Sequence, residues 1–146
     1  MVDLATIKPN DRIIEITNPG TGENLGVRVT VMSYDDDRLK KTRRQLTDKR
    51  FADDQKRKPL RSEQVEENGN ILLFSAMTGW EWYNPTGDEG DADYDADATP
   101  EFAGDPNPAF NRRNVFTVFD ALPWFRAQVD TAVADEEAFF INSKSV

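Results

Sequence analysis

An acidic insert rich in glycine and proline separates two hydrophobic segments of this chain, and it constrains the fold more than any other feature. An apolar run at residues 71–80 leads into the insert, and a second run at residues 114–122 leads out of it. Because neither run can bury its side chains alone, the two should pack together and leave the insert outside as a solvated loop. We therefore expect residues 81–110 to form a long irregular loop between the second and third helices, mobile where its aspartates repel one another.

A β-hairpin is predicted over residues 11–33. Two segments rich in β-branched side chains lie at residues 12–17 and 27–32, and valines alternate with other residues in the second, as in a half-buried strand. Between them, Pro19 fixes its own φ and Gly20 accepts a positive φ, which suits a turn. Two strands alone are marginally stable in water, so the hairpin must pack on helices or pair with a neighbour.

Two helices are predicted between the hairpin and the insert. The first, at residues 36–58, is strongly basic, and Asp36 with its acidic neighbours supplies an N-cap and favourable charge. The second, at residues 62–80, is expected to end near Gly79. The buried face predicted for this second helix comprises Val65, Leu72, Ala76 and Trp80.

Two further helices are predicted at residues 112–140, with Pro123 in the first turn of the last one. The whole is a mainly α fold with an N-terminal β-hairpin, a small α+β fold, in a single domain spanning residues 1–146. The hairpin and the basic helix both look incomplete alone, so we also expect the protein to self-associate.

The basic helix is the candidate element for binding a partner. A helix with so few apolar residues is either a solvent-exposed arm or one whose narrow apolar stripe docks on another molecule. Aromatic side chains are also favoured as binding hot spots, and Trp82 lies at the start of the insert. The predicted partner-binding residues are Leu39, Arg43, Leu46, Arg50, Phe51 and Trp82.

Enzyme, metal and cofactor chemistry is not expected. The sequence has no His and no Cys, which removes the usual activating base, thiol nucleophiles and thiolate metal ligands. The aspartate repeat that starts at Asp91 does not fit a calcium loop, which needs Gly at its sixth position and Glu at its twelfth, where this chain has Ala96 and Phe102. We predict no catalytic, metal-binding or cofactor-binding residue.

The overall charge disfavours nucleic acid and membrane surfaces as partners. The net charge is −9 and the pI is near 4.5, although residues 38–61 are basic. Stacking aromatics that would accompany single-strand binding are nearly absent from that basic stretch, where Phe51 is the only one. No apolar run is long enough for a membrane span and no secretory signal is evident, so we expect a cytoplasmic location.

Short segments follow one another along the chain in a distinctive order. They are PGTGENLG at residues 19–26, TGW at 78–80, FNRRNV at 110–115, LPWFRAQV at 122–129, and the final Asp135 with Phe139-Phe140. Their order, over nearly the whole chain, resembles the tail assembly chaperones of long-tailed (siphovirus-type) bacteriophages and prophages, small proteins encoded just before the tape measure. The acidic insert is longer than that family's pattern implies.

The resemblance implies a non-enzymatic, mostly helical protein that coats the tape measure protein, keeps this long apolar rod soluble and helps recruit tail tube protein. It also implies a protein of the host cytoplasm that is displaced during assembly and is absent from the mature virion. Two other classes stay open. A structural virion protein, such as a head–tail connector or minor tail component, would add its hairpin to a neighbour's sheet. The third class, a nucleic-acid-binding protein, is supported by the basic stretch alone. It predicts binding that becomes weaker as salt increases.

Overall fold

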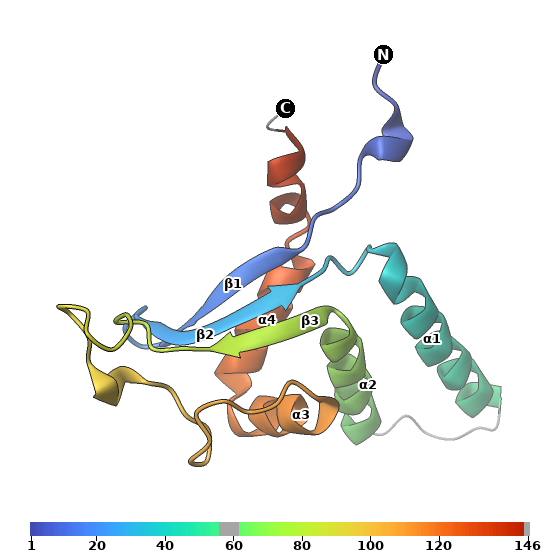
Figure 1. Cartoon of the computed structure of the whole chain (residues 1–146). Helices are drawn as coiled ribbons and strands as arrows, with labels where there is room; N and C mark the ends of the chain where they lie inside the picture. Colours follow the sequence, from blue (N-terminus) through green and yellow to red (C-terminus); the bar gives the residue numbers. More distant parts are fainter. Residues whose placement is uncertain (56–61, 145–146) are drawn as a thin grey trace.

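The alternating valines form the middle strand of an antiparallel sheet (Figure 1). The computed structural model describes residues 1–55 and 62–144. In it, β2 (Asn24–Val31) pairs with β1 (Arg12–Thr17) on one side and with β3 (Met77–Trp82) on the other. The pairing of β1 with β2 confirms the predicted hairpin. With four α-helices and about 48% helical content, the described part of the chain is a small α+β fold.

The prediction of a helix over residues 62–80 was wrong at its C-terminal end. α2 (Ser62–Ser75) stops early, and the chain returns along β2 as β3, with Gly79 inside the strand instead of at a helix end. Trp80 and Trp82 lie opposite valines of β2, so their period-two spacing places both indoles on the inner face of the sheet. A continuous helix would have pointed these two side chains in different directions. β3 is also the neighbour that the hairpin needed.

The basic helix is present, and it extends away from the sheet (Figure 1). α1 (Lys40–Gln55) follows a 3₁₀ turn, η2 (Asp37–Leu39), for which Asp36 is the N-cap. The last three residues of the helix predicted at 36–58 lie outside the described residues. α1 also contacts α2.

The predicted C-terminal helices are α3 (Arg112–Ala121) and α4 (Pro123–Ala134). The prediction ran the last helix to residue 140, but α4 ends at Ala134 and a 3₁₀ helix, η4 (Glu137–Lys144), follows it. The acidic residues at 135–137 explain the early end, because in a longer helix they would stand near its C-terminus, where the macrodipole disfavours negative charge.

The core lies between the inner face of the sheet and the helices α2, α3 and α4. α4 crosses behind the sheet (Figure 1), and its Phe125 and Val129 are buried in the same cluster as Val29 of β2. The outer face of the sheet carries mostly charged and polar side chains, together with Ile13, which is 65% exposed. This one-sided burial agrees with the alternation of apolar and polar residues along the strands.

The acidic insert is a loop, as expected, although its first two predicted residues belong to β3. It folds into turns and one short 3₁₀ helix, η3 (Ala96–Ala98). The insert also supplies apolar groups to the core, since Phe102 and Phe110 pack against it. The indole N–H of Trp80 donates a hydrogen bond of 2.8 Å to the carbonyl of Pro108. The insert therefore covers one end of the core and is not wholly outside it.

Candidate protein-binding site

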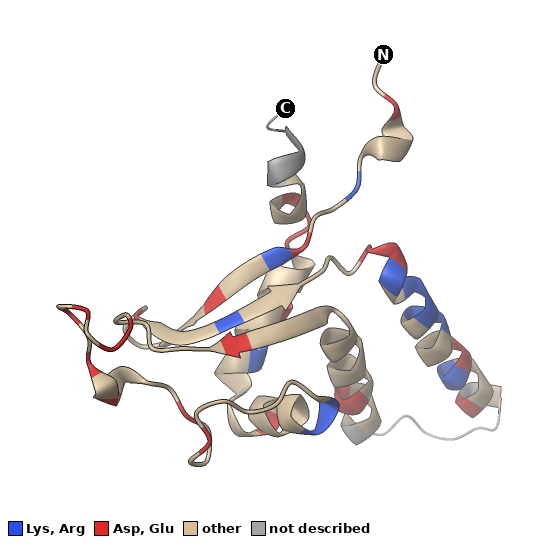
Figure 2. Ribbon diagram, viewed as in Figure 1, with Lys and Arg blue, Asp and Glu red and all other residues tan. Residues whose placement is uncertain are grey.

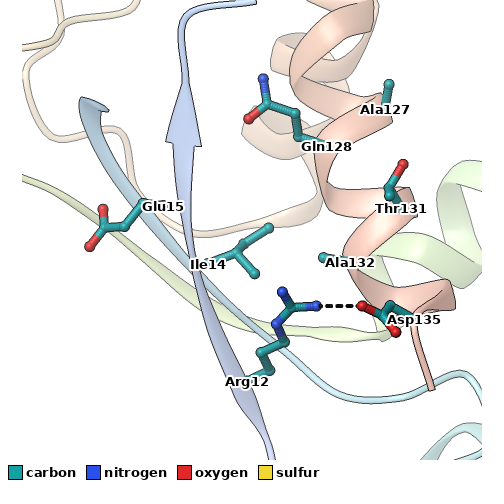
Figure 3. Close-up of a pocket in the computed structure, with 8 residues that line it drawn as sticks. All are labelled: Arg12, Ile14, Glu15, Ala127, Gln128, Thr131, Ala132 and Asp135. Atoms are coloured by element: carbon teal, nitrogen blue, oxygen red, sulfur yellow. Dashed lines mark ion pairs between the residues drawn. The ribbon is translucent and has the colours of Figure 1, made fainter. Parts of the chain in front are cut away.

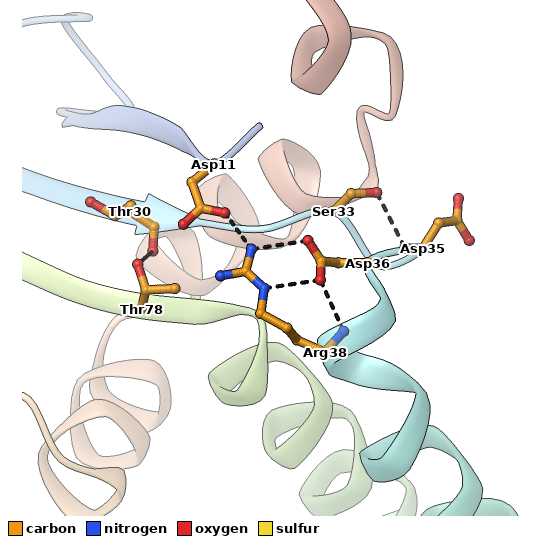
Figure 4. Close-up of polar contacts among 7 residues, drawn as sticks. All are labelled: Asp11, Thr30, Ser33, Asp35, Asp36, Arg38 and Thr78. Carbon is orange, nitrogen blue, oxygen red and sulfur yellow. Dashed lines mark hydrogen bonds and ion pairs between the residues drawn. The ribbon is translucent and has the colours of Figure 1, made fainter. Parts of the chain in front are cut away.

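A polar network fixes the start of α1 to the body of the protein (Figure 4). The guanidinium of Arg38 donates hydrogen bonds to the carboxylates of Asp36 and Asp11. The carboxylate of Asp36 also accepts a hydrogen bond from the backbone N–H of Arg38 at 2.9 Å. The hydrogen bonds from Arg38 outweigh the effect of burial and lower the pKa of Asp36. This anchor sets the direction in which α1 leaves the sheet.

The apolar stripe predicted for the basic helix is shorter in the structure. Leu39 is only 1% exposed and belongs to the core cluster, so it supports the fold and is not available to a partner. Leu46 is half-buried. Phe51, in contrast, is 63% exposed. Phe51 is therefore the main apolar group that α1 offers to another molecule.

Basic side chains accompany Phe51 along α1. Arg50 is exposed, whereas Arg43 is half-buried with its Nη1 3.9 Å from the carboxylate of Asp35. The Nε of Arg43 is buried without a hydrogen-bond partner among the described residues. Figure 2 shows basic residues along α1, interrupted by acidic ones in its second half, and acidic residues gathered in the insert at the opposite end of the molecule. The basic residues of α1 are Lys40, Lys41, Arg43, Arg44, Lys49 and Arg50.

Trp82 is separate from the α1 surface. It ends β3 beside the insert, where its ring packs edge-on against Trp80 at a centroid distance of 5.5 Å. Its Nε1 is buried and has no hydrogen-bond partner within the described part of the chain. The structure thus brings together Arg43, Leu46, Arg50 and Phe51 on one helix, and places Trp82 elsewhere.

Trp82 lines an apolar cavity of about 350 Å³, which we call the Trp82 cavity. Its other walls come from β1, β2, the junction of α3 with α4, and residues 97–102 of the insert. Asp97 and Glu101 line it and are exposed. Sequence reasoning missed this cavity. The available signals were Phe102, the one phenylalanine in an acidic stretch, and the bulky Trp124 next to a helix-starting proline.

A ladder of opposite charges crosses the outer face of the sheet. The Nε of Arg28 on β2 lies 2.6 Å from Glu15 on β1, and its Nη1 lies 3.5 Å from Glu81 on β3. The hydroxyl of Tyr83 donates a hydrogen bond to Glu15 at 2.6 Å, and the Tyr83 ring lies 4.0 Å from the Arg28 guanidinium. Burial would raise the pKa of Glu15, but the hydrogen bonds from Tyr83 and Arg28 outweigh it and lower that pKa. These charges are already paired, so the ladder serves the sheet.

A groove of about 380 Å³ runs between β1 and α4 (Figure 3). The side-chain amide of Gln128 occupies both backbone groups of Thr17, accepting from its N–H at 2.9 Å and donating to its carbonyl at 2.8 Å. Elsewhere in the groove, the guanidinium of Arg12 lies 3.6 Å from the carboxylate of Asp135. Gln128 thus takes the place of a neighbouring strand at this end of β1, which protects the edge from strand addition.

Comparisons with protein-family models, with curated proteins and with solved structures give no match for this chain. Across residues 1–55 and 62–144, no group of three or more acidic side chains is arranged to hold a metal ion. None of the helices that the structure describes combines the length and the apolar composition needed to cross a membrane. α1 and the Trp82 cavity, with their exposed or unpaired groups, are the candidate surfaces for a partner.

Proposed function

We propose that this protein is a tail assembly chaperone of a long-tailed bacteriophage or prophage. It binds the tape measure protein, keeps that protein soluble and helps recruit tail tube protein in the host cytoplasm. It catalyses no reaction, and it dissociates before the virion is complete. The observation that carries the proposal is α1, a basic helix that extends from the body and presents the 63% exposed Phe51. The ordered segments that resemble this family support it independently.

The side chains of α1 suit reversible contact with a long apolar rod. Phe51 offers a rigid aromatic contact, and such residues contribute strongly to binding. Lys49 and Arg50 beside it are exposed. Their long aliphatic stems cover apolar surface while their charged ends stay in water. A tape measure coated by such helices would bury its apolar stripe and present charge to the solvent.

The state of the β1 edge favours this proposal over a structural virion protein. The rival class was expected to add its hairpin to the sheet of a neighbour. At Thr17, however, the outward backbone groups already bond to the side chain of Gln128. At this end of β1, a new strand would have to displace this pair, which makes the Thr17 end a poor template for strand addition.

Quantitative mass spectrometry of purified phage particles, with lysate from infected or induced cells, tests the proposal. We expect the protein to be abundant in the lysate and absent from the particles. Stoichiometric presence in particles would refute the chaperone and leave a structural virion protein.

Co-expression with the tape measure tests the role of α1 directly. The partner to use is the tape measure protein, which the resemblance implies is encoded immediately downstream. We expect the wild-type chain to increase the soluble fraction of that protein, and Phe51→Ser to remove most of the increase. Ala52→Ser is the matched control, because Ala52 is the next residue of α1 and is also exposed. Equal solubilisation by both variants would exclude Phe51 from the contact.

A further inference from the structure

The Trp82 cavity has walls that suit a large apolar group. Four aromatic side chains line it, namely Trp82, Phe102, Trp124 and Phe125. Phe125 is buried in the core, whereas the other three are half-buried. The volume of about 350 Å³ is within the roughly 300–1,000 Å³ typical of ligand pockets. Aromatic walls favour edge-to-face contacts with a further ring, so an aromatic side chain is the best-matched occupant.

Hydrogen bonds and close packing hold the wall that the insert supplies. The side-chain amide of Asn84 donates hydrogen bonds to the carbonyl of Asp95 at 2.7 Å and to the hydroxyl of Thr99 at 3.0 Å. At Gly26, β2 approaches the insert so closely that an added Cβ would lie 3.2 Å from the ring of Pro100. Residues 97–102 are therefore held against the sheet before any partner arrives, and a preformed site needs little ordering when it binds.

The rim of the cavity carries unpaired negative charge. Asp97 and Glu101 line the cavity and are exposed. Residues 88–105 include eight acidic residues and no basic one. Across residues 1–55 and 62–144, no ion pair involves any of these eight carboxylates, whereas the charges on the outer face of the sheet are paired. An apolar cavity with such a rim suits a partner that combines an apolar group with positive charge.

We infer that the Trp82 cavity binds a basic segment of another protein, which inserts one aromatic side chain and places lysine or arginine side chains against Asp97 and Glu101. The buried aromatic anchor supplies most of the affinity. The exposed charges speed association and select basic segments, and their effect weakens as salt increases. The inference does not rest on the chaperone function, because α1 lies at the opposite end of the molecule and stays accessible (Figure 2).

Tryptophan fluorescence of the full chain, titrated with synthetic peptides, tests the inference. Two of the three tryptophans line the cavity, so an occupant should change their emission. The probe is acetyl-Gly-Arg-Phe-Lys-Gly-amide, which contains no tryptophan. We expect saturable binding, with shifted NMR signals from the indole N–H groups of Trp82 and Trp124. Replacing the phenylalanine of the peptide by alanine should weaken binding at least about 30-fold, as for a lost hot spot. Replacing its two cations by glutamine should weaken binding roughly 2- to 10-fold at low salt.

A cavity-filling variant tests where the peptide binds. Ala98 is half-buried in the wall of the cavity, so Ala98→Phe should occupy the space and weaken binding at least about 30-fold. Ala92→Phe is the matched control, because Ala92 is an exposed alanine of the same insert that does not line the cavity. Circular dichroism checks that both variants keep the fold.

A charge variant tests the rim without changing the cavity. Asp97→Asn with Glu101→Gln should weaken binding of the basic peptide roughly 2- to 10-fold and flatten its dependence on salt. Glu89→Gln with Asp93→Asn changes the net charge equally at exposed positions that do not line the cavity. This control pair should bind the peptide nearly as wild type does.

Three results would overturn the inference. The first is equal affinity for the phenylalanine and alanine peptides, and the second is unchanged binding by Ala98→Phe. The third is self-association of the wild-type chain that Ala98→Phe abolishes, because a second copy would then occupy the cavity. The solubilisation assay with Phe51→Ser concerns the opposite end of the molecule, so the chaperone function and the cavity can fail separately.

Discussion

The sheet-centred body and α1 differ in how much they bury. In the body, Val29 and Val31 of β2 and Phe125 of α4 are at most 1% exposed. α1 is 16 residues long, yet none of its described side chains is buried. The nearest buried side chain is Leu39, in the turn that precedes the helix. Apolar burial therefore stabilises the sheet-centred body, whereas α1 is held mainly by its junction with that body.

This difference shows where stability and binding reside. Burial of apolar surface contributes about 25 cal/mol per Å², so the body carries most of the folding free energy. At 16 residues, α1 is only slightly longer than the roughly 12–15 residues below which an isolated helix is marginal in water, so it depends on the N-capped turn η2, on the Arg38 anchor and on α2. A helix held in this way can present its side chains to a partner without exposing the core.

The largest effect is expected from Phe125→Ala in the body. Phe125 is 1% exposed and its ring lies 6.4 Å from Trp80 and 6.3 Å from Phe119. Removal of a buried Phe side chain leaves a cavity and should lower the free energy of unfolding by about 3–5 kcal/mol. Urea unfolding measures this loss. A decrease below about 1 kcal/mol would mean that the core is not packed around this ring.

A smaller effect is expected from Arg38→Ala at the junction. The substitution leaves the buried carboxylate of Asp36 without its charged partner and should lower stability by about 1–2 kcal/mol. Native-state hydrogen exchange locates the loss, because amides of α1 should lose protection while those of β2 keep theirs. Arg44→Ala is the control, since Arg44 is an exposed arginine of α1 whose replacement should change stability by less than about 0.5 kcal/mol. Equal loss of protection in α1 and β2 would show that they unfold as one unit.

Local patterns predicted most of the fold. Alternating valines, the N-cap at Asp36 and Pro123 at a helix start act over a few residues, and they located the hairpin, the basic helix and the C-terminal helices. β3 was missed because its apolar run suits a helix or a strand equally, and the choice depends on pairing with β2, which is distant in the sequence.

The candidate site was predictable in part. Helical spacing and charge located Phe51 and Arg50 on α1. The same spacing placed Leu39 on the stripe, but the helix begins only after Leu39, and the preceding turn directs that side chain into the core. The Trp82 cavity could not be predicted, because its walls come from separate segments that only the tertiary fold brings together.

A smaller effect on the stability of both regions is expected at acid pH. Hydrogen bonds lower the pKa of Asp36 at the junction of α1 from its ordinary value of 3.8, and they lower the pKa of Glu15 on the sheet from 4.5. The unfolded chain therefore takes up these protons first as pH falls. The stability that each carboxylate contributes is complete above its unfolded pKa, and it is lost as pH falls through the lower pKa of the folded state.

Asp36→Asn and Glu15→Gln test this pH dependence, because neither new side chain titrates. We expect each variant to show a flatter decline of stability between about pH 5 and pH 2 than wild type, measured by urea unfolding across that range. The two groups lie in separate networks, so the changes in slope should add in the double variant. An Asp36→Asn profile parallel to wild type would mean that the junction carboxylate contributes nothing pH-dependent to folding.

The smallest effect on stability is expected from Phe51→Ser in α1. Phe51 is 63% exposed, so the substitution removes little packing, and Phe and Ser have similar helix propensities. The free energy of unfolding should change by less than about 0.5 kcal/mol, against the several kcal/mol expected for Phe125→Ala. Urea unfolding of the two variants under the same conditions makes the comparison. A loss above about 1 kcal/mol at Phe51 would place its ring against the body, and α1 would then be part of the folding core. If Phe51→Ser leaves the free energy of unfolding unchanged but weakens binding, then the function of α1 depends on a side chain that contributes little to the stability of the fold.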